Sequence, residues 1–366
     1  MYRKLWVLVF TLLGTLLLVG GVLAAAQPAE HRLSRAVVAS PADLTPTYWL
    51  TVTTTSDVGG SDPNSERCDT HSPCTLRRAL NEAHYYSAPG QIFHIGFDIP
   101  TGDPGYDAGN GVWIITVNSD NSGSETHAFR DFGVYGKVIV DGTTQPGGRA
   151  LIVGPRIVLR GDNKKGAFNL TGGRNVIRGL AFQGFANNMI TIPATNENLV
   201  EQNWFGLNVA GDDIYLRNPA YPEDGSGEAG VYAQMSGSSG TTNTIQSNVL
   251  VGFKGVAISV QGNNNFVLSN TVGTRANGTV PDVRADRKCK PNARYNNWFP
   301  GAGIDIFGRG NLVAYNRIVG LLFQSNDPLN TPDDAISVTG RNHIIRENII
   351  GLTSDGVPFG TCGEGI

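Results

Sequence analysis

The sequence predicts an all-β fold, a right-handed parallel β-helix with a short capping helix near the N-terminus. The first observation is a repeated phrase, Asn-x-Val/Ile-x-x-Asn, which is followed three or four positions after its second Asn by Gly. Its starts lie 23, 45, 22, 46 and 32 residues apart. A basic period of 22 to 23 residues is typical of a solenoid, in which each coil buries its apolar face against its neighbours. Complete copies start at Asn198, Asn243, Asn265 and Asn311, and degraded copies start at Asn175 and His343.

The second observation is that apolar branched residues alternate within the phrase, as at Val200, Ile245 and Val267, which indicates strands and not helices. A further apolar stretch, such as Gly303–Ile306, follows in each unit, so each coil holds about three short strands. Asn suits the corners because it tolerates the left-handed backbone region and its amide bonds to neighbouring backbone. We therefore expect a ladder of stacked amides at one corner, formed by Asn203, Asn248, Asn270, Asn316 and Asn348.

The two long intervals admit two interpretations, either two coils or one coil with a long loop. Only one Gly-Val/Ile strand lies in each interval, which favours one coil with a loop. The predicted loops cover residues 207–229, 274–302 and 352–364. They leave the coil from the same corner, so they should lie on one side, roughly 10 Å apart along the stack.

The composition and the N-terminal sequence limit the possible partners and the location of the protein. The chain has 366 residues, 16% of them charged, and a net charge of −3, which favours neither nucleic acid nor an anionic membrane surface as a partner. Arg3 and Lys4 precede an apolar run, which predicts a signal peptide over residues 1–26, with an uncleaved anchor as the alternative. Residues 27–47 read as a flexible linker. We expect an exported monomer that touches a membrane only through the N-terminal apolar segment or through a C-terminal anchor beyond the sequence.

Export makes disulfides expected. Cys68 and Cys74 are close in sequence and predict a local disulfide. Cys289 and Cys362 fall in the second and third predicted loops, where they either staple the two loops together or stay unpaired.

A helix should cover the first coil, because Leu76, Ala79, Leu80 and Ala83 recur at helical spacing after Thr75, a good N-cap. The stretch Cys74–Ala83 resembles the CSLREA-type motif of secreted bacterial β-helix proteins, although Arg78 stands where that motif has an acidic residue. Val140–Gly147 resembles a phrase of their first coils. The resemblance implies a pectate-lyase-like fold group of mixed functions, with the cap and first coils over 48–147 and the repeats over 148–366. Gly363–Ile366 reads as the start of another strand, so we expect the repeats to continue.

Carboxylates offer a catalytic hypothesis. The phrase containing Asp333 and Asp334 resembles the Asp-Asp phrase of polygalacturonase-type hydrolases, and Asp305 lies one coil earlier. Such enzymes need one carboxyl group to protonate the leaving oxygen and another to activate water. Ala302 stands where that family has a further Asp, and the alternative is that Asp333 and Asp334 are polar turn residues. A lyase would instead use Ca²⁺, for which the candidate ligands are Asp212, Asp213, Glu223 and Asp224.

Aromatic residues offer a binding hypothesis. If Phe205 points into the core, Trp204 points outward on the side of the loops, near Trp298 and Phe299. Aromatic faces along a groove can hold sugar rings. The alternative is that Trp204 packs under its own loop. The sequence thus favours a secreted or cell-surface module without catalysis and without a cofactor, adhesin-like or glycan-binding. A polysaccharide lyase or glycoside hydrolase acting on acidic polysaccharide is the alternative, and a structural stalk is a third hypothesis.

Overall fold

The computed structural model describes most of the chain from Tyr48 to Ile366, and these residues belong to one compact unit, Pro41–Ile366. The predicted signal peptide, 1–26, and linker, 27–47, lie outside the described residues. The structure describes residues 48–59, 67–68, 72–117, 127–131, 136–162, 166–215, 230–234, 242–253, 256–280, 302–320, 334–360 and 365–366.

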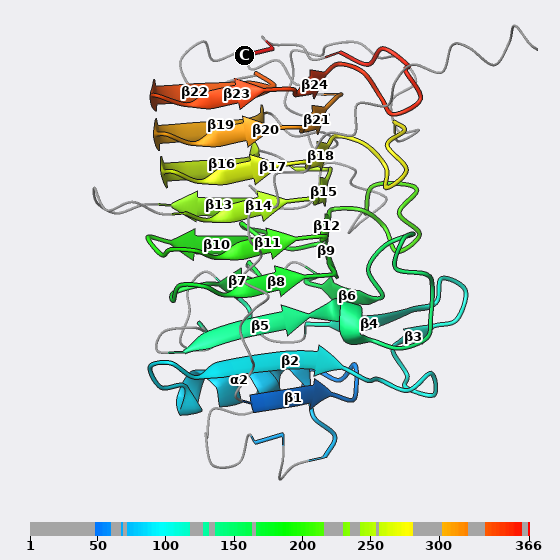
Figure 1. The fold of residues 1–366 in the computed structure, drawn as a ribbon. Helices are drawn as coiled ribbons and strands as arrows, with labels where there is room; N and C mark the ends of the chain where they lie inside the picture. Colours follow the sequence, from blue (N-terminus) through cyan, green and yellow to red (C-terminus); the bar gives the residue numbers. More distant parts are fainter. Residues whose placement is uncertain are drawn as a thin grey trace, which may run out of the picture. The chain divides into compact units, whose positions relative to one another are not determined.

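The described fold contains three sheets, in each of which the strands lie one above the other. All strand pairs are parallel except β3 with β4 (Figure 1). Sheet I contains β1 (Tyr48–Val52), β2 (Ile92–Phe97), β5 (Lys137–Asp141), β8 (Val176–Arg178), β11 (Leu199–Glu201), β14 (Thr244–Gln246), β17 (Phe266–Leu268), β20 (Leu312–Ala314) and β23 (Ile344–Arg346). Sheet II contains β3 (Tyr106–Asp107), β4 (Val112–Thr116), β6 (Ile157–Arg160), β9 (Leu180–Gln183), β12 (Trp204–Phe205), β15 (Val249–Leu250), β18 (Thr271–Val272), β21 (Arg317–Ile318) and β24 (Ile349–Ile350). Sheet III contains β7 (Phe168–Asn169), β10 (Ile190–Pro193), β13 (Val231–Gln234), β16 (Val256–Asn263), β19 (Ala302–Arg309) and β22 (Ile336–Arg341).

From β7 onward the chain visits sheets III, I and II in turn, and each strand pairs with the one three elements later. The apolar residues of the phrase stack in register, with Val200 opposite Ile245 and Ile245 opposite Val267. These side chains are fully or almost fully buried in one continuous core. The prediction of an all-β, solenoid-like stack of parallel strands is therefore confirmed.

The predicted helix is α2 (Leu76–Tyr86), which packs against β1 and β2 at the N-terminal end of the stack. Thr75 is its N-cap, and its hydroxyl accepts a hydrogen bond from the Arg78 N–H at 3.1 Å. The side chains at the expected helical spacing, Leu76, Ala79 and Leu80 among them, are buried. A short 3₁₀ turn, η3 (Gly142–Thr144), follows β5. The helix therefore covers the first strands, as the spacing predicted.

The predicted asparagine ladder is present at the corner between sheets I and II. Asn203, Asn248, Asn270 and Asn316 each donate their backbone N–H to the side-chain oxygen of the next ladder residue, at 2.9–3.1 Å, ending at Asn348. One part of the prediction was wrong: the left-handed residue is not Asn but the residue before it. These residues are Gln202, Ser247, Ser269, Tyr315 and Glu347, with φ between 54° and 61°.

A second ladder lies at the corner between sheets III and I, and the sequence had not suggested it. It starts at Asn175, whose N–H donates to Asn198 Oδ1 at 2.9 Å, and continues through the first Asn of each phrase. At its last step the Asn311 N–H donates to His343 Nδ1 at 3.3 Å. The other members are Asn243 and Asn265.

The long intervals each hold one coil and a loop, as predicted, because β11 pairs directly with β14 and β17 pairs directly with β20. The described parts of the loops, 207–215, 274–280 and 352–360, follow sheet II on the right of Figure 1. They touch one another: Ala276 N–H donates to Gly211 O at 2.9 Å, and Ser354 N–H donates to Gly278 O at 3.2 Å. The loops thus lie on one side and are closer than expected.

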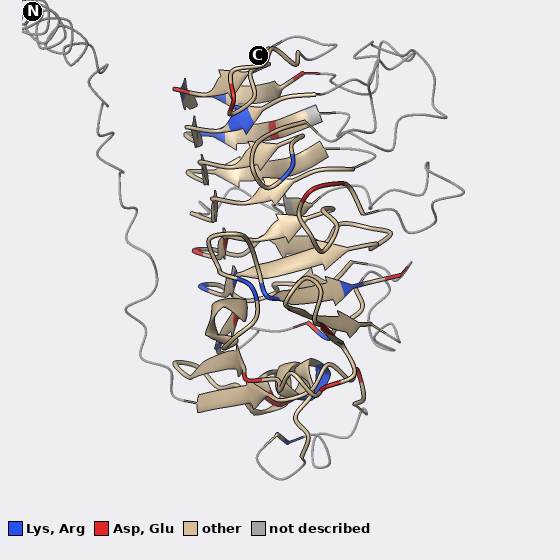
Figure 2. Ribbon diagram, turned by 90° about the vertical axis from the view of Figure 1, so that its right-hand side faces the viewer, with Lys and Arg blue, Asp and Glu red and all other residues tan. Residues whose placement is uncertain are grey.

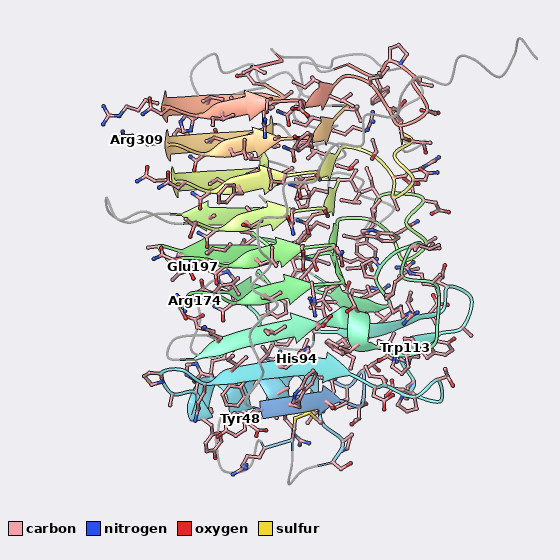
Figure 3. All side chains as sticks on the ribbon, in the orientation of Figure 1. Tyr48, His94, Trp113, Arg174, Glu197 and Arg309 are labelled. Carbon is pink, nitrogen blue, oxygen red and sulfur yellow. A yellow bond between two sulfur atoms is a disulfide. The ribbon has the colours of Figure 1, made fainter. Side chains whose placement is uncertain are left out.

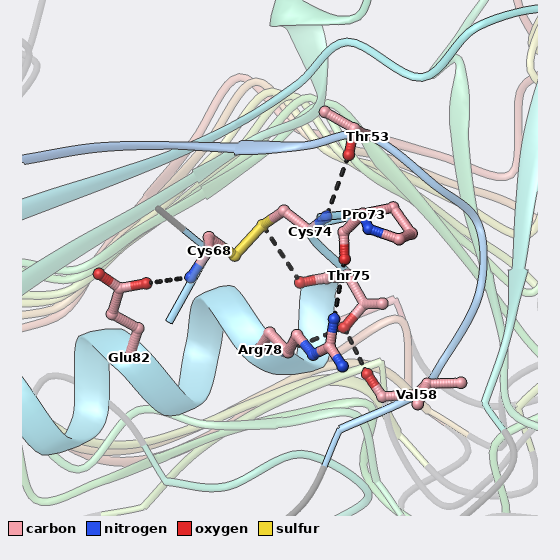
Figure 4. The surroundings of a disulfide bond; sticks show 8 residues. All are labelled: Thr53, Val58, Cys68, Pro73, Cys74, Thr75, Arg78 and Glu82. Carbon is pink, nitrogen blue, oxygen red and sulfur yellow. Dashed lines mark hydrogen bonds between the residues drawn. A yellow bond between two sulfur atoms is a disulfide. The ribbon is translucent and has the colours of Figure 1, made fainter. Parts of the chain in front are cut away.

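A disulfide joins Cys68 to Cys74 beside the start of α2, which confirms the local pairing (Figure 4). Glu82 accepts a hydrogen bond from the Cys68 N–H at 2.7 Å, and Thr53 accepts one from the Cys74 N–H at 3.1 Å. Cys289 and Cys362 lie outside the described residues. At the other end of the stack, Gly365 accepts a hydrogen bond from the Ile336 N–H, as Ala335 does from Ile304.

Candidate functional site

Asp305 is the described carboxyl group whose pKa is raised most above its ordinary value, which favours the neutral form. It lies on the outer face of β19, since Ile304 and Ile306 point into the core, and its strand partners are Ser259 and Ser337. It is only 8% exposed, and its Oδ1 has no hydrogen-bond partner in the described part of the chain. Burial raises the pKa of Asp305 to about 6, against the opposing hydrogen bond with Ser337. A carboxyl group in this state can act as an acid near neutral pH.

The strand register separates Asp305 from its predicted catalytic partner. Asp305 is paired with Ser337, and Asp334 lies three residues before Ser337, level with Ala302. Three residues of strand span roughly 10 Å, whereas paired carboxyl groups in glycosidases lie about 5–9.5 Å apart. Asp333 lies outside the described residues. The register therefore brings Asp305 beside two serines instead of beside Asp334.

Trp204 lies on the outer side of sheet II, as the register predicted, but the residue is only 6% exposed. It packs with Leu207 and Ile214 of the following loop in a small apolar cluster. Glycines crowd its edges, because a Cβ atom on Gly154 or Gly211 would come within 2.0 or 2.4 Å of the ring. Trp204 therefore packs under its own loop and presents no open face to a sugar. Trp298 and Phe299 lie outside the described residues.

A groove of about 400 Å³ lies beside the edge of Trp204. Its floor follows the corner between sheets I and II, where the left-handed residues Gln202 and Ser247 stack, and one wall is the loop before β6. The lining residues carry hydroxyl, amide and apolar groups and no ionisable side chain. They are Thr143, Leu151, Ile152, Val153, Gly154, Pro155, Gly179, Gln202, Trp204, Ser247 and Ala276.

The loop wall carries an exposed apolar tip, Leu151–Val153, in which Ile152 is 98% exposed. Two arginines, Arg149 and Arg156, hold the loop through hydrogen bonds to backbone carbonyl groups. Arg149 Nε donates to Pro155 O at 2.9 Å, its Nη1 donates to Val209 O, and its guanidinium lies 4.6 Å from the Trp204 ring centroid. Arg156 Nε donates to Arg149 O at 2.7 Å. Burial lowers the pKa of Arg149 to about 10, so it stays charged at neutral pH.

The apolar tip was missed by sequence reasoning, because an Ala-Leu-Ile-Val run ordinarily indicates a buried strand. The signal that could have indicated otherwise is the pair of arginines and the prolines and glycines around the run, from Pro146 to Arg156. Such residues are typical of a loop that is held in one conformation. Figure 2, which views the side carrying the sheet II loops, shows charged residues scattered thinly over a mostly uncharged ribbon.

The two predicted metal ligands that the structure describes, Asp212 and Asp213, accept hydrogen bonds from residues of their own loop. Asp212 accepts a hydrogen bond from Asn208 Nδ2 at 2.7 Å, and Asp213 accepts one from the Ile214 N–H at 2.8 Å. No group of three or more His, Cys, Asp or Glu side chains suited to a metal occurs among the described residues. Glu223 and Asp224 lie outside them.

Comparison with known proteins names no family: no protein-family model matches the sequence, and no curated protein matches it significantly. In the part of the chain that the structure describes, no helix has the length and apolar character needed to cross a membrane.

Proposed function

We propose that the chain is an exported right-handed parallel β-helix of the CSLREA type that binds a neutral sugar chain without catalysis, as an adhesin-like surface module. The repeated passage through sheets III, I and II supports a closed coil with three strands per turn. The two asparagine ladders support it further, because each corner keeps the same residue type and the same bond from coil to coil. The disulfide Cys68–Cys74 is the kind that persists in an oxidising compartment, which supports export.

The observation that carries the binding role is the composition of the groove. Its walls are apolar, its floor offers the amide of Gln202 and the hydroxyl of Ser247, and its lining has no ionisable group. A sugar ring has apolar faces and hydroxyl edges, so it suits such a lining better than an ion does. The groove volume lies near the lower end of ligand pockets, which hold roughly 300–1,000 Å³. The monomer would present this groove and the loop side of the stack as its contact surface.

Rigidity of the tip adds to this proposal. Exposed aliphatic residues have an energetic cost in water, and Arg149 and Arg156 hold them in place with several bonds to backbone carbonyls. A wall fixed before binding loses little conformational entropy when a ligand arrives.

The test compares glycan binding by the full chain and by Ile152→Ser, using a panel of neutral oligosaccharides followed by calorimetry on those that bind. The control is Ile344→Ser, an exposed isoleucine on sheet I away from the groove. We expect Ile152→Ser to weaken binding by about tenfold, the effect of losing one packed side chain, and Ile344→Ser to leave it unchanged. Equal binding by all three proteins, or no binding at all, would overturn the proposal.

Asp305 keeps a hydrolase as the second candidate, since its raised pKa suits a general acid. A reducing-end assay on acidic polysaccharide with the parent chain and Asp305→Asn distinguishes the two. Release of new ends by the parent and not by the variant would favour the enzyme over the binding module.

A further inference from the structure

Two arginines lie side by side at the corner between sheets III and I. Arg309 ends β19, Arg341 ends β22, and the two residues are direct partners in neighbouring parallel strands. Adjacent strands are about 4.8 Å apart. Both side chains are exposed, and Arg309 lies at the outer edge of the stack (Figure 3).

Neither guanidinium has a carboxylate partner within the residues that the structure describes. The contrast along the same edge is clear, because Arg174 forms an ion pair with Glu197 (Figure 3). Like charges placed opposite one another on a sheet repel and lower its stability. The pair Arg309 and Arg341 thus gives a local concentration of unneutralised positive charge on a chain whose net charge is −3.

The backbone beneath the pair is fixed by stacked glycines. Gly262, Gly308 and Gly340 are partners in β16, β19 and β22, with φ of 154°, 118° and 126°. A Cβ atom on Gly308 would meet Gly262 O at 2.2 Å, and one on Gly340 would meet Gly308 O at 1.9 Å. Only glycine fits this kink. The two arginines therefore start from a rigid strand end and not from a loose loop.

An exposed aromatic ring, Phe307, lies two residues before Arg309 on β19. Phe307 is 37% exposed on the outer face of β19, and its partner on β22 is the exposed Thr339. A flat apolar side chain, a hydroxyl and two guanidiniums are thus presented together. Guanidinium recognises carboxylate and sulfate groups through paired hydrogen bonds, and an aromatic face packs against the apolar face of a sugar ring.

We propose that Arg309, Arg341 and Phe307 form a second binding surface, for a sugar chain that carries carboxylate or sulfate groups. This extends the proposed glycan-binding function by giving an anionic ligand class to a surface separate from the neutral groove. An acidic peptide would use the two arginines equally well, but it would gain nothing from stacking a ring on Phe307.

The test measures binding of the full chain to polygalacturonate, dextran sulfate, unmodified dextran and poly-glutamate at low and moderate salt. We expect binding to one or both anionic glycans, weakened by salt, with polygalacturonate and dextran sulfate telling carboxylate from sulfate recognition. The double variant Arg309→Gln/Arg341→Gln should bind at least about tenfold more weakly, and Phe307→Ala should weaken glycan binding alone. Arg174→Gln, whose parent arginine is already paired, should bind like the parent.

Thermal unfolding keeps the result interpretable, because removing two repelling charges should leave the double variant at least as stable as the parent. Unchanged binding by a folded double variant would overturn the proposal. Binding of poly-glutamate as tight as that of the glycans, with no effect of Phe307→Ala, would overturn it in favour of an acidic peptide. Ile152→Ser separates the two surfaces: it should alter neutral binding only, so either proposal can fail while the other holds.

Discussion

Asn270 Oδ1 accepts two hydrogen bonds from Asn248, one from its backbone N–H at 3.1 Å and one from its side-chain amide at 3.0 Å. The same Asn248 amide also donates to Val200 O, one coil earlier, at 2.9 Å. Its own Oδ1 accepts from the Asn203 N–H at 3.0 Å. The buried Asn248 side chain thus bonds to the backbone of the preceding coil and to the side chain of the following one, which is why the corner keeps the same residue type.

Asn248→Ala should therefore lower the free energy of unfolding by roughly 2–6 kcal/mol, since it leaves the Asn203 N–H and Val200 O without partners at a cost of about 1–3 kcal/mol each. Chemical denaturation measures the difference. The control is Asn196→Ala, because Asn196 is exposed and not part of either ladder, and should change stability by less than about 0.5 kcal/mol. A similar loss in both variants would contradict the ladder's role.

The ladder and the coil register were predictable because their residues repeat with the coil. Val200, Ile245 and Val267 face the same core, so each coil needs a branched apolar residue there. The left-handed corner position could not be predicted from residue type. Gln202, Ser247 and Tyr315 all adopt φ near 60°, yet their side chains share no property that marks it. The hydrogen bonds of the following Asn, not an intrinsic preference, hold these residues in that conformation.

The candidate site was less predictable, because it depends on contacts between loops that the repeat does not encode. Alternation placed Trp204 outside the main core correctly, but only the fold shows that Arg149 and Gly154 cover it from a loop some 50 residues earlier in the sequence. The same holds for Ile152, whose apolar neighbours suggested burial. Periodicity reports which face of a strand a residue occupies and does not report what lies above that face.

Arg149→Ala should release the apolar tip. The change removes the hydrogen bonds to Pro155 O and Val209 O and the contact with the Trp204 ring, so stability should fall by about 2–4 kcal/mol. Hydrogen exchange should quicken in residues 150–154, and glycan binding in the groove should weaken. Arg174→Ala is the control, because Arg174 is exposed and only its surface ion pair with Glu197 would be lost. Unchanged exchange in the tip would show that Arg149 does not fix the loop.

Asp305 should make stability fall as pH rises. Burial raises the pKa of its carboxyl group from 3.8 to about 6 in the folded chain, so the folded state favours the protonated form. The resulting stability is full below about pH 4 and is lost as pH rises through about 6. Asp305→Asn should remove this dependence and raise stability at pH 7.5 by up to roughly 3 kcal/mol. Denaturant unfolding from pH 4 to 8 measures it, with the exposed Asp212→Asn as control. Parallel profiles for the parent and Asp305→Asn would refute it.

His127 should act with the opposite sign in nearly the same range. Burial lowers the pKa of its imidazole from 6.5 to about 4, against the attraction of Asp131, so the folded state favours the neutral ring, which contacts Thr191 Oγ1 at 3.0 Å. This stability is full above about pH 6.5 and is lost as pH falls through about 4. His127→Gln keeps a group able to hydrogen-bond to Thr191 and should remove the loss of stability that His127 causes as pH falls, which leaves the opposite Asp305 dependence in place. Exposed histidine behaviour, with a proton taken up near pH 6.5 in NMR titration of the folded chain, would contradict the burial of this ring. The Asp305 and His127 effects oppose each other between pH 4 and 6. The stability of the parent should therefore change less with pH in this range than that of Asp305→Asn, which keeps the His127 effect, or of His127→Gln, which keeps the Asp305 effect.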